Sequence, residues 1–562
     1  MKKQSQNNLK RSMTIKDLVK SGYFPEELLP VFSTEELADA LPKIIPLLAK
    51  YIKKRPVSKL LPFSIPKAKG YRRNLSIPNP LQYIQLAKTI AENWDDIQAH
   101  AEKSKISISR LNPGGPRAIK KFKFDDFIDE RLHRSVGSRY LLKIDITRFY
   151  NSIYTHSIPW AIHTKAVTKV ERSRKIHFGN GLDQDCRNTQ DGQTIGLPIG
   201  PDTSRIISEV ILAAVDKVIQ KSIPGLQGIR IIDDYYLYFK TIAEVEIARS
   251  IIHKTLHEYE LELNPNKEAV IEIPEIIESN WYRELKGIRF SNDATKQRKE
   301  LIAFFDVAFM YAKKNPEDAV LSYAISKIRP TIFKRVNTRV LVSLLVNALI
   351  QEPKIISQLS EILTSYDKSR HPLNKTLLSA ALNEFILFHC LHNNDYEIAW
   401  GLWTIKNLKL KLTKNTANQV SENRNSIIAL VSLDLKRSGC IPAGLNTKIW
   451  RSMLTAENLY TESWLLAYEA KVKGWLRTAD DYISTDPFFN QLKTEKVRFY
   501  NPKKKLDISR VKVSTSDSSV SGYEDDEEEE KETPPHRNRP KRVASTPTQS
   551  DLDDEWFKEI FG

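Results

Sequence analysis

Apolar positions recur along this chain with two different periods, and each period predicts a different kind of element. Apolar residues three or four apart predict helices over 34–51, 81–100 and 202–218. A short apolar run at 140–146 ends in a carboxylate, which is typical of a buried strand. At 228–239, β-branched and aromatic residues flank an acidic centre, and this pattern predicts a β-hairpin.

The rest of the chain is mostly helical in its pattern. A helix is predicted over 242–261, and a β-rich stretch is expected over 271–290. From 299 to 492 the helical pattern is interrupted only by single breakers such as Pro316 and Pro353. No sequence repeat is strong enough to name, but stacked helix pairs of the solenoid type suit such a stretch.

Both ends of the chain are polar. Residues 1–16 and 503–550 contain too little apolar surface to fold by themselves, and we expect them to be flexible or disordered. Residues 551–562 end in a small amphipathic cluster. This cluster predicts either a helix that docks back on the body or a peptide that binds a partner protein.

Composition excludes several classes of protein. With 41% hydrophobic and 28% charged residues among 562, the chain is neither wholly disordered nor fibrous. No run approaches the ~18 apolar residues of a membrane span, so we expect no membrane partner. Residues 1–13 lack the apolar centre of a secretory signal. Three widely separated cysteines predict no disulfide framework or zinc cluster, which favours a reducing compartment.

The charge of the chain points to a class of partner. The formal net charge is +17 and the isoelectric point is near 9.4. Such an excess in a chain of ordinary composition favours nucleic acid, as RNA or single-stranded DNA. Within 299–492, four lysines lie close together and predict a basic surface for a nucleic-acid strand: Lys406, Lys409, Lys411 and Lys414.

Three carboxylates are candidates for catalysis. Asp145 ends the predicted strand, and Asp233 and Asp234 lie at the turn of the predicted hairpin. Nucleotidyl transfer uses two divalent cations about 4 Å apart. Magnesium takes hard oxygen ligands and keeps several waters, so two or three carboxylates plus substrate phosphates suffice. These residues therefore predict a two-metal site.

The surroundings of these carboxylates resemble a known family. Four ordered segments carry the resemblance: Asp145-Ile-Thr-Arg-Phe-Tyr150, Gly196-Leu-Pro-Ile-Gly-Pro201, Ile-Ile-Asp233-Asp234 and Leu263-Asn-Pro-Asn-Lys267. They resemble the ordered palm motifs of reverse transcriptases. Together with Gly22-Tyr-Phe-Pro near the start, they look like the bacterial unknown-group reverse transcriptases, which include abortive-infection and defence-associated enzymes.

The resemblance implies a fold and a set of domains. It covers roughly 15–295 and implies an α+β fold, with the palm and fingers of a right-hand polymerase over 17–295. An all-α, HEAT-like helical domain over 299–492 would follow in place of an ordinary thumb. A disordered acidic and basic linker at 503–550 and an amphipathic motif at 551–562 would complete the chain.

The resemblance also implies roles for the residues around the metals. Asp145 and Asp233 would ligate both ions with help from the carbonyl of Ile146, and Asp234 would be a weaker ligand. Tyr150 matches the steric gate that rejects a ribose 2′-hydroxyl, with a core aromatic as the alternative.

Other positions match nucleotide-binding and proton-donating residues of the family. Gly196 and Gly200 would let the backbone approach the base and the primer terminus. Lys267 matches a lysine that donates a proton to the leaving pyrophosphate, with a solvated lysine as the alternative. Arg73 matches the arginine that grips the triphosphate, and Arg72 is its rival.

Two positions depart from the family pattern. Ile231 stands where reverse transcriptases commonly have tyrosine, and Ile199 replaces a common glutamine. Both positions lie near primer and template in the family. These departures question templated synthesis more than they question metal-dependent chemistry.

Together these observations predict a cytoplasmic bacterial reverse transcriptase of antiphage defence, either RNA-directed or template-independent. Its cofactor would be Mg²⁺, or Mn²⁺, and its substrates deoxynucleoside triphosphates. Protein-primed covalent DNA and a homo-oligomer stay open. So do two alternatives, a retron or group-II-intron-type reverse transcriptase and a non-catalytic nucleic-acid-binding scaffold. The intact Asp145, Asp233 and Asp234 argue against the scaffold.

Overall fold

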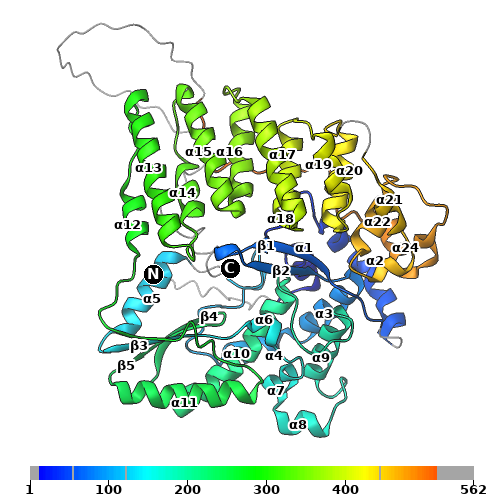
Figure 1. Cartoon of the computed structure of the whole chain (residues 1–562). Helices are drawn as coiled ribbons and strands as arrows, with labels where there is room; N and C mark the ends of the chain where they lie inside the picture. Colours follow the sequence, from blue (N-terminus) through cyan, green and yellow to red (C-terminus); the bar gives the residue numbers. More distant parts are fainter. Residues whose placement is uncertain (1–11, 53–55, 121–122, 442–444, 515–562) are drawn as a thin grey trace, which may run out of the picture.

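The structure is a computed structural model that describes residues 12–52, 56–120, 123–441 and 445–514. In Figure 1 a lower part built around a four-stranded sheet lies beneath an upper array of helices, with a two-stranded hairpin between them. Buried apolar side chains form one cluster that runs through both parts. No helix within the described ranges is long and apolar enough to cross a membrane.

The four-stranded sheet is antiparallel, with the order β4–β5–β3–β6. Its strands are β3 (Tyr140–Asp145), β4 (Gln227–Ile231), β5 (Asp234–Phe239) and β6 (Ala269–Glu272). Two helices pack on it: α11 (Ile242–Glu258) contacts β3 and β5, and α5 (Phe124–Ser135) contacts β4 and β5. β5 is rich in aromatic residues because such side chains suit a buried, pleated surface.

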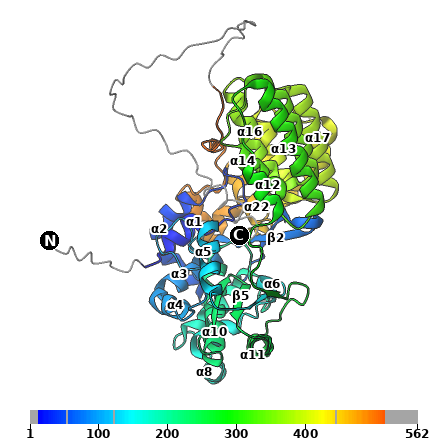
Figure 2. The same cartoon turned by 90° about the vertical axis from the view of Figure 1, so that its left-hand side faces the viewer.

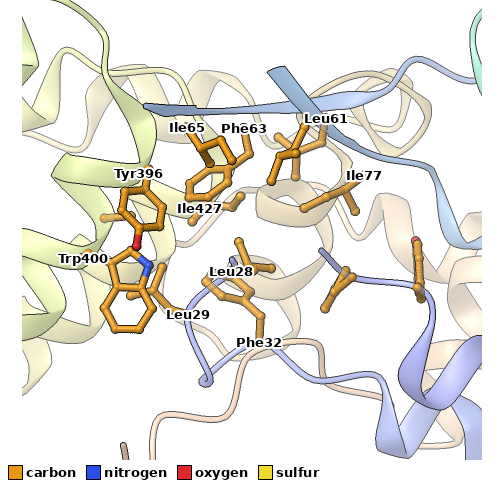
Figure 3. Packing of buried hydrophobic residues seen from close by; sticks show 14 of the residues in the cluster. Leu28, Leu29, Phe32, Leu61, Phe63, Ile65, Ile77, Tyr396, Trp400 and Ile427 are labelled. Carbon is orange, nitrogen blue, oxygen red and sulfur yellow. The ribbon is translucent and has the colours of Figure 1, made fainter. Parts of the chain in front are cut away.

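The two-stranded hairpin joins the lower and upper parts. Its strands are β1 (Leu61–Pro66) and β2 (Arg72–Ile77). Alternate residues of β1 are buried, as the two-residue period of a strand requires. Figure 3 shows Phe63 and Ile65 of β1 beside Tyr396, which belongs to α18 (Asp395–Asn407) of the upper part. The hairpin is therefore packed on the helical array by its apolar face.

Further helices complete the lower part. They are α1 (Ile15–Ser21), α2 (Glu35–Ile52), α3 (Pro80–Glu92), α4 (Trp94–Ala101), α6 (Phe149–Ser152), α7 (Ser157–His163), α8 (Lys165–Val170), α9 (Phe178–Thr189) and α10 (Asp202–Ser222). Helix α10 contacts α3, α4, α7 and α11, and most of its residues are buried. It is the central helix of this part.

The upper part stacks its helices in two layers (Figures 1 and 2). In one layer each helix packs on the next: α14 (Val320–Ile328), α16 (Ile356–Lys368), α18, α20 (Ser426–Arg437) and α22 (Trp464–Val472). The other layer contains α13 (Ala294–Lys314), α15 (Thr338–Gln351), α17 (Lys375–Leu391) and α19 (Lys414–Ser421). The first layer is almost wholly buried, whereas the second exposes one face.

Short elements fill the ends of the array and the turns. The helices are α12 (Asn280–Gly287), α21 (Lys448–Ser452), α23 (Tyr482–Thr485) and α24 (Pro487–Thr494). The 3₁₀ turns are η1 (Ala68–Gly70), η2 (Arg335–Asn337), η3 (Pro353–Ile355) and η4 (Glu457–Tyr460).

Most predicted elements are confirmed within a few residues, among them α2, α10, α11 and the hairpin of β4 and β5. The helix expected over 81–100 is two helices, because Asn93 between them has φ −118° and ψ 26°. The prediction of a β-rich stretch up to 290 was wrong. Only β6 is a strand there, and α12 follows it because its apolar residues Trp281, Tyr282 and Leu285 pack against the array.

Two predicted boundaries at the start of domains need correction. The helical array begins before 299, because α12 already packs against α13 and α14. The prediction of a flexible segment over 1–16 is wrong for its last residues. Met13 is buried, and the side chain of Thr14 caps α1.

The prediction of a disordered linker is wrong for 503–514. These residues pack on the array, where Lys512 N donates to Arg329 O at 2.9 Å. The rest of this linker and the amphipathic motif at 551–562 lie outside the described residues.

Candidate active site

Three carboxylates lie together at one end of the four-stranded sheet. Asp145, the last residue of β3, pairs with Asp234, the first residue of β5, in the antiparallel register. Asp233 precedes it in the two-residue turn between β4 and β5. The other turn residue, Ile232, has a φ of 51°, which is rare for a β-branched side chain and costs of order 1–3 kcal/mol. The paired strands on either side hold this turn, and with it Asp233, in place.

Burial and mutual repulsion raise the pKa of the Asp233 and Asp234 carboxylates. Burial raises the pKa of Asp233 to about 7, and the charges of Asp234 and Asp145 add to the increase. Burial, followed by the charge of Asp145, raises the pKa of Asp234 to about 6. The three groups form a concentrated negative site that a nearby cation would stabilise.

The turn after α11 supplies two side chains that hold the Asp145 carboxylate. Lys267 Nζ donates to Asp145 Oδ2 at 2.6 Å, and Asn264 Nδ2 donates to Oδ1 at 3.0 Å. Burial lowers the pKa of Lys267, but its hydrogen bond to Asp145 and the charges of the carboxylates outweigh burial, so the pKa is raised. Sequence reasoning identified Lys267 and missed Asn264, although both lie in the same short segment.

The donor atoms at this site suit a hard divalent cation. The carboxylates of Asp145, Asp233 and Asp234 lie beside Ile146, which directly follows β3 and pairs with Leu263 as an isolated bridge. Among the described residues, no three His, Cys, Asp or Glu side chains are gathered into a ready-made metal site. Magnesium often binds through one or two carboxylates plus substrate phosphates. These oxygen donors therefore suit the predicted Mg²⁺, although the protein side chains alone do not form a complete coordination site.

The β1–β2 hairpin separates the two candidate arginines. Lys67, at the hairpin tip, has its pKa lowered first by burial and then by the charge of Arg73. Arg73 also acts electrostatically on Tyr150, which places it near the carboxylates. Arg72 points to the other face of β2, where its Nη2 donates to Glu397 Oε2 at 2.9 Å. Arg73 is therefore the candidate at the site, and Lys67 is a cation that sequence reasoning missed.

Tyr150 lies half-buried in α6, near the carboxylates. Ser208 Oγ on α10 donates to Tyr150 Oη at 3.3 Å, and the ring centroid lies 5.3 Å from that of Phe149. Burial raises the pKa of Tyr150, and Asp233 is one of the charges that act on it. Part of the ring packs on its neighbours and part is exposed to solvent, so the position suits a side chain that contacts the sugar of a nucleotide.

The loop that contains Gly196 and Gly200 requires glycine at both positions. Gly196 has a φ of 90° and Gly200 a φ of 121°. A Cβ at Gly200 would also come within 2.7 Å of Pro25 Cγ. Arg117 ties this loop to the lower part, because its Nη2 donates to Gly200 O at 3.0 Å and its Nε to Asp202 Oδ1 at 2.9 Å. No motif signals Arg117, and sequence reasoning did not find it.

The basic surface predicted on the helical array is wrong in part. Lys406 Nζ donates to Asp434 Oδ2 at 2.5 Å, and little of its side chain is exposed. Lys411 Nζ donates to the carbonyl of Gly439. Lys409, Lys411 and Lys414 are exposed. The four lysines therefore do not form one free basic surface, because Lys406 is held in its ion pair with Asp434 and Lys411 is bonded to the carbonyl of Gly439.

Part of the chain is similar to a known protein family. Residues 65–299 match the model of the family described as reverse transcriptase (RNA-dependent DNA polymerase). This segment contains the three carboxylates with Arg73 and Lys267. No curated protein matches the chain.

Three solved structures are similar to parts of the chain, all with low identity. Apo telomerase from Candida Tropicalis truncated from its C-terminal domain is 13% identical with a TM-score of 0.28, over 43% of this chain and 56% of that one. Apo telomerase from Candida Tropicalis is 12% identical with a TM-score of 0.29, over 71% of each chain. Telomerase from Candida albicans in complex with a fragment of telomeric RNA is 12% identical with a TM-score of 0.27, over 74% and 69%. The chain thus spans just over half the length of the truncated telomerase.

Proposed function

We propose that the chain extends a hydroxyl group with deoxynucleotides by a two-metal mechanism, since residues 65–299 match the model of the reverse transcriptase family. The acceptor is a 3′-hydroxyl of a nucleic acid or a hydroxyl of a protein side chain. One observation carries the proposal. Asp145 of β3 and Asp234 of β5 face each other across adjacent strands, with Asp233 in the turn just before β5 and Lys267 bonded to Asp145.

Each residue has a role that follows from its place. Asp145, Asp233 and Asp234 would hold Mg²⁺, or Mn²⁺, with help from the carbonyl of Ile146. Such ions would supply Lewis-acid stabilisation of the negative charge on the transferred phosphate. Lys267 keeps a proton on Nζ, because its pKa is raised, and can give it to the departing pyrophosphate.

The cations of the hairpin and the loop residues bind the nucleotide. Arg73 and Lys67 come from the β1–β2 hairpin and neutralise the triphosphate. Tyr150 excludes a ribose 2′-hydroxyl. Gly196 and Gly200, which lack side chains, admit the base and the primer terminus to the backbone.

Ile231 and Ile199 bear on whether the enzyme needs a template. Ile231 is buried at the end of β4, and the carbonyl of Ile199 accepts a hydrogen bond from Ser76 N at 2.9 Å. Neither position offers the tyrosine or glutamine side chain that reverse transcriptases commonly have there. We therefore propose that the enzyme is either RNA-directed with a limited template requirement or template-independent.

The layout of the chain supports a biological role. A polymerase domain followed directly by stacked helix pairs matches the arrangement of bacterial defence-associated reverse transcriptases, in which a HEAT-like domain replaces the thumb. We propose antiphage defence in the bacterial cytoplasm, with the palm and fingers in the lower part. The free cysteines Cys186, Cys390 and Cys440 suit a reducing compartment.

The test is nucleotide incorporation by the purified full-length chain. Labelled deoxynucleoside triphosphates and Mg²⁺ are supplied with and without an RNA template and primer, and nucleic acid that copurifies is sequenced. Label that stays with the protein after denaturation would indicate a protein primer. Incorporation in any of these reactions supports the proposal, and its absence in all of them would favour a nucleic-acid-binding scaffold.

A further inference from the structure

Helix α18 begins against the β1–β2 hairpin with two acidic residues. Asp395 Oδ2 accepts a hydrogen bond from Ser64 N at 2.8 Å, and Ser64 Oγ accepts one from Asp395 N at 3.3 Å. Glu397 binds both terminal nitrogens of Arg72, with Nη2 and Oε2 2.9 Å apart, and its side chain is 1% exposed. Arg72 Nη2 also donates to Ser64 O at 3.0 Å. A buried, two-pronged contact of this kind holds the planar guanidinium in one orientation.

The rest of the hairpin is attached to the helical array as well. Asn425 Nδ2 donates to Pro62 O at 2.9 Å, so the first strand is bonded to the start of α20. At the tip, Lys69 Nζ lies 2.5 Å from Glu317 Oε1 between α13 and α14. The apolar face of the hairpin packs on α18 and α20, as Figure 3 shows. Both strands and the tip are thus held by the array.

Strand β2 of the hairpin also contacts the catalytic part. Ser76 N on β2 donates to the carbonyl of Ile199, which lies in the loop between Gly196 and Gly200. Arg73 is next to Arg72 in β2 and lies on the face that carries Ile65, its register partner, and its charge acts on Lys67 and Tyr150. The hairpin is therefore a direct connection between α18 and the site.

We propose that α18 is a positioning element for nucleotide binding. Glu397 and Asp395 fix Arg72 and Ser64, and the hairpin held in this way presents Arg73 to the triphosphate of the incoming nucleotide. The inference rests on the proposed function, because Arg73 has a triphosphate to bind only if the chain uses nucleotides. Glu397 acts through Arg72, so it is a positioning residue.

The experiment uses the full-length chain with Glu397→Gln, which keeps the size of the side chain and removes its charge. Two quantities are measured: kcat and KM for a deoxynucleoside triphosphate, and hydrogen exchange of the β1–β2 amides. We expect faster exchange in the hairpin. We also expect KM to rise about 10- to 100-fold with kcat little changed, because small displacements of a binding group are costly.

Two further variants keep the test decisive if Glu397→Gln folds poorly. Arg72→Lys retains the positive charge and loses the planar fork, so KM should rise by a smaller factor. The double variant Arg72→Gln with Glu397→Gln should be no worse than Glu397→Gln alone, because the two residues act as one unit.

The matched control is Glu361→Gln, which removes an ion pair inside the array. Glu361 Oε2 on α16 lies 2.7 Å from Arg329 Nη1 at the end of α14. This variant should leave KM and the exchange of the hairpin unchanged. If it raised KM as much as Glu397→Gln, the effect would be general destabilisation and the proposal would be wrong.

The outcomes separate this inference from the proposed function. An active parent whose KM is unchanged by Glu397→Gln and Arg72→Lys overturns the inference alone, even if exchange in the hairpin becomes faster. A parent that incorporates no nucleotide refutes the proposed function and this inference with it.

Discussion

Replacement of Tyr150 by alanine is the most direct test of how the site selects its substrate. The Tyr150 ring packs against Phe149 at 5.3 Å between centroids, and its hydroxyl accepts a hydrogen bond from Ser208 at 3.3 Å. Tyr150→Ala removes the ring and leaves space at the position where we propose that a ribose 2′-hydroxyl is excluded. Excluding one small group by packing is worth about 1–3 kcal/mol, so discrimination against ribonucleotides should fall about 10- to 200-fold.

The assay is the ratio of kcat/KM for a ribonucleotide to kcat/KM for the matching deoxynucleotide. Tyr150→Phe is the control, because it keeps the ring, removes only the bond to Ser208 and should leave the ratio near that of the parent. Tyr150→Ala also costs stability, since half-buried aromatic packing is lost, so both variants are compared well below their melting temperatures. A ratio that is the same in Tyr150→Ala and in the parent would make Tyr150 a core aromatic and would refute the argument for a sugar contact.

Three other outcomes follow from the structure. Asp233→Asn together with Asp234→Asn should lower nucleotide incorporation by about 1,000-fold or more while the fold is retained, as measured by incorporation and circular dichroism. Gly200→Ala should lower the free energy of unfolding, measured in urea, by about 2–4 kcal/mol, because Gly200 has a φ of 121° and a Cβ there would lie 2.7 Å from another atom. Gly225→Ala is the control. Gly225 has a φ of 77° and no atom within 4 Å of its Cβ position, so the loss should be only about 1 kcal/mol. Burial raises the pKa of Glu469 from 4.5 to about 7. The folded state therefore binds more protons than the unfolded state between these pH values, and stability should fall as pH rises through this window. Glu469→Gln should remove up to about 3 kcal/mol of that fall, measured as the difference in unfolding free energy between pH 5 and pH 8; an equal fall in the variant would contradict the burial of this charge.

Elements and motifs that depend on residues close together in the chain could be predicted from the sequence alone. Short-range periodicity identified α10, α11 and the β4–β5 hairpin, because the burial of one face repeats at the period of the element itself. The order of residues also placed Asp145 at a strand end and Asp233 in a turn, whereas Asp234, predicted in the same turn, is the first residue of β5. A strand end and a hairpin turn are local features, so the candidate carboxylates were recognisable before any packing was known.

Tertiary structure decided which side chains work together at this site. The sequence could not choose between Arg72 and Arg73, because the partner of Arg72 is Glu397, 325 positions away. For the same reason Asn264 and Lys67 were missed as neighbours of the carboxylates, and two of the four clustered lysines proved to be held within the array. Hydrophobic periodicity and the residue preferences of turns depend on residues close in sequence. Ion pairing, burial and pKa shifts depend on groups that only the folded chain brings together.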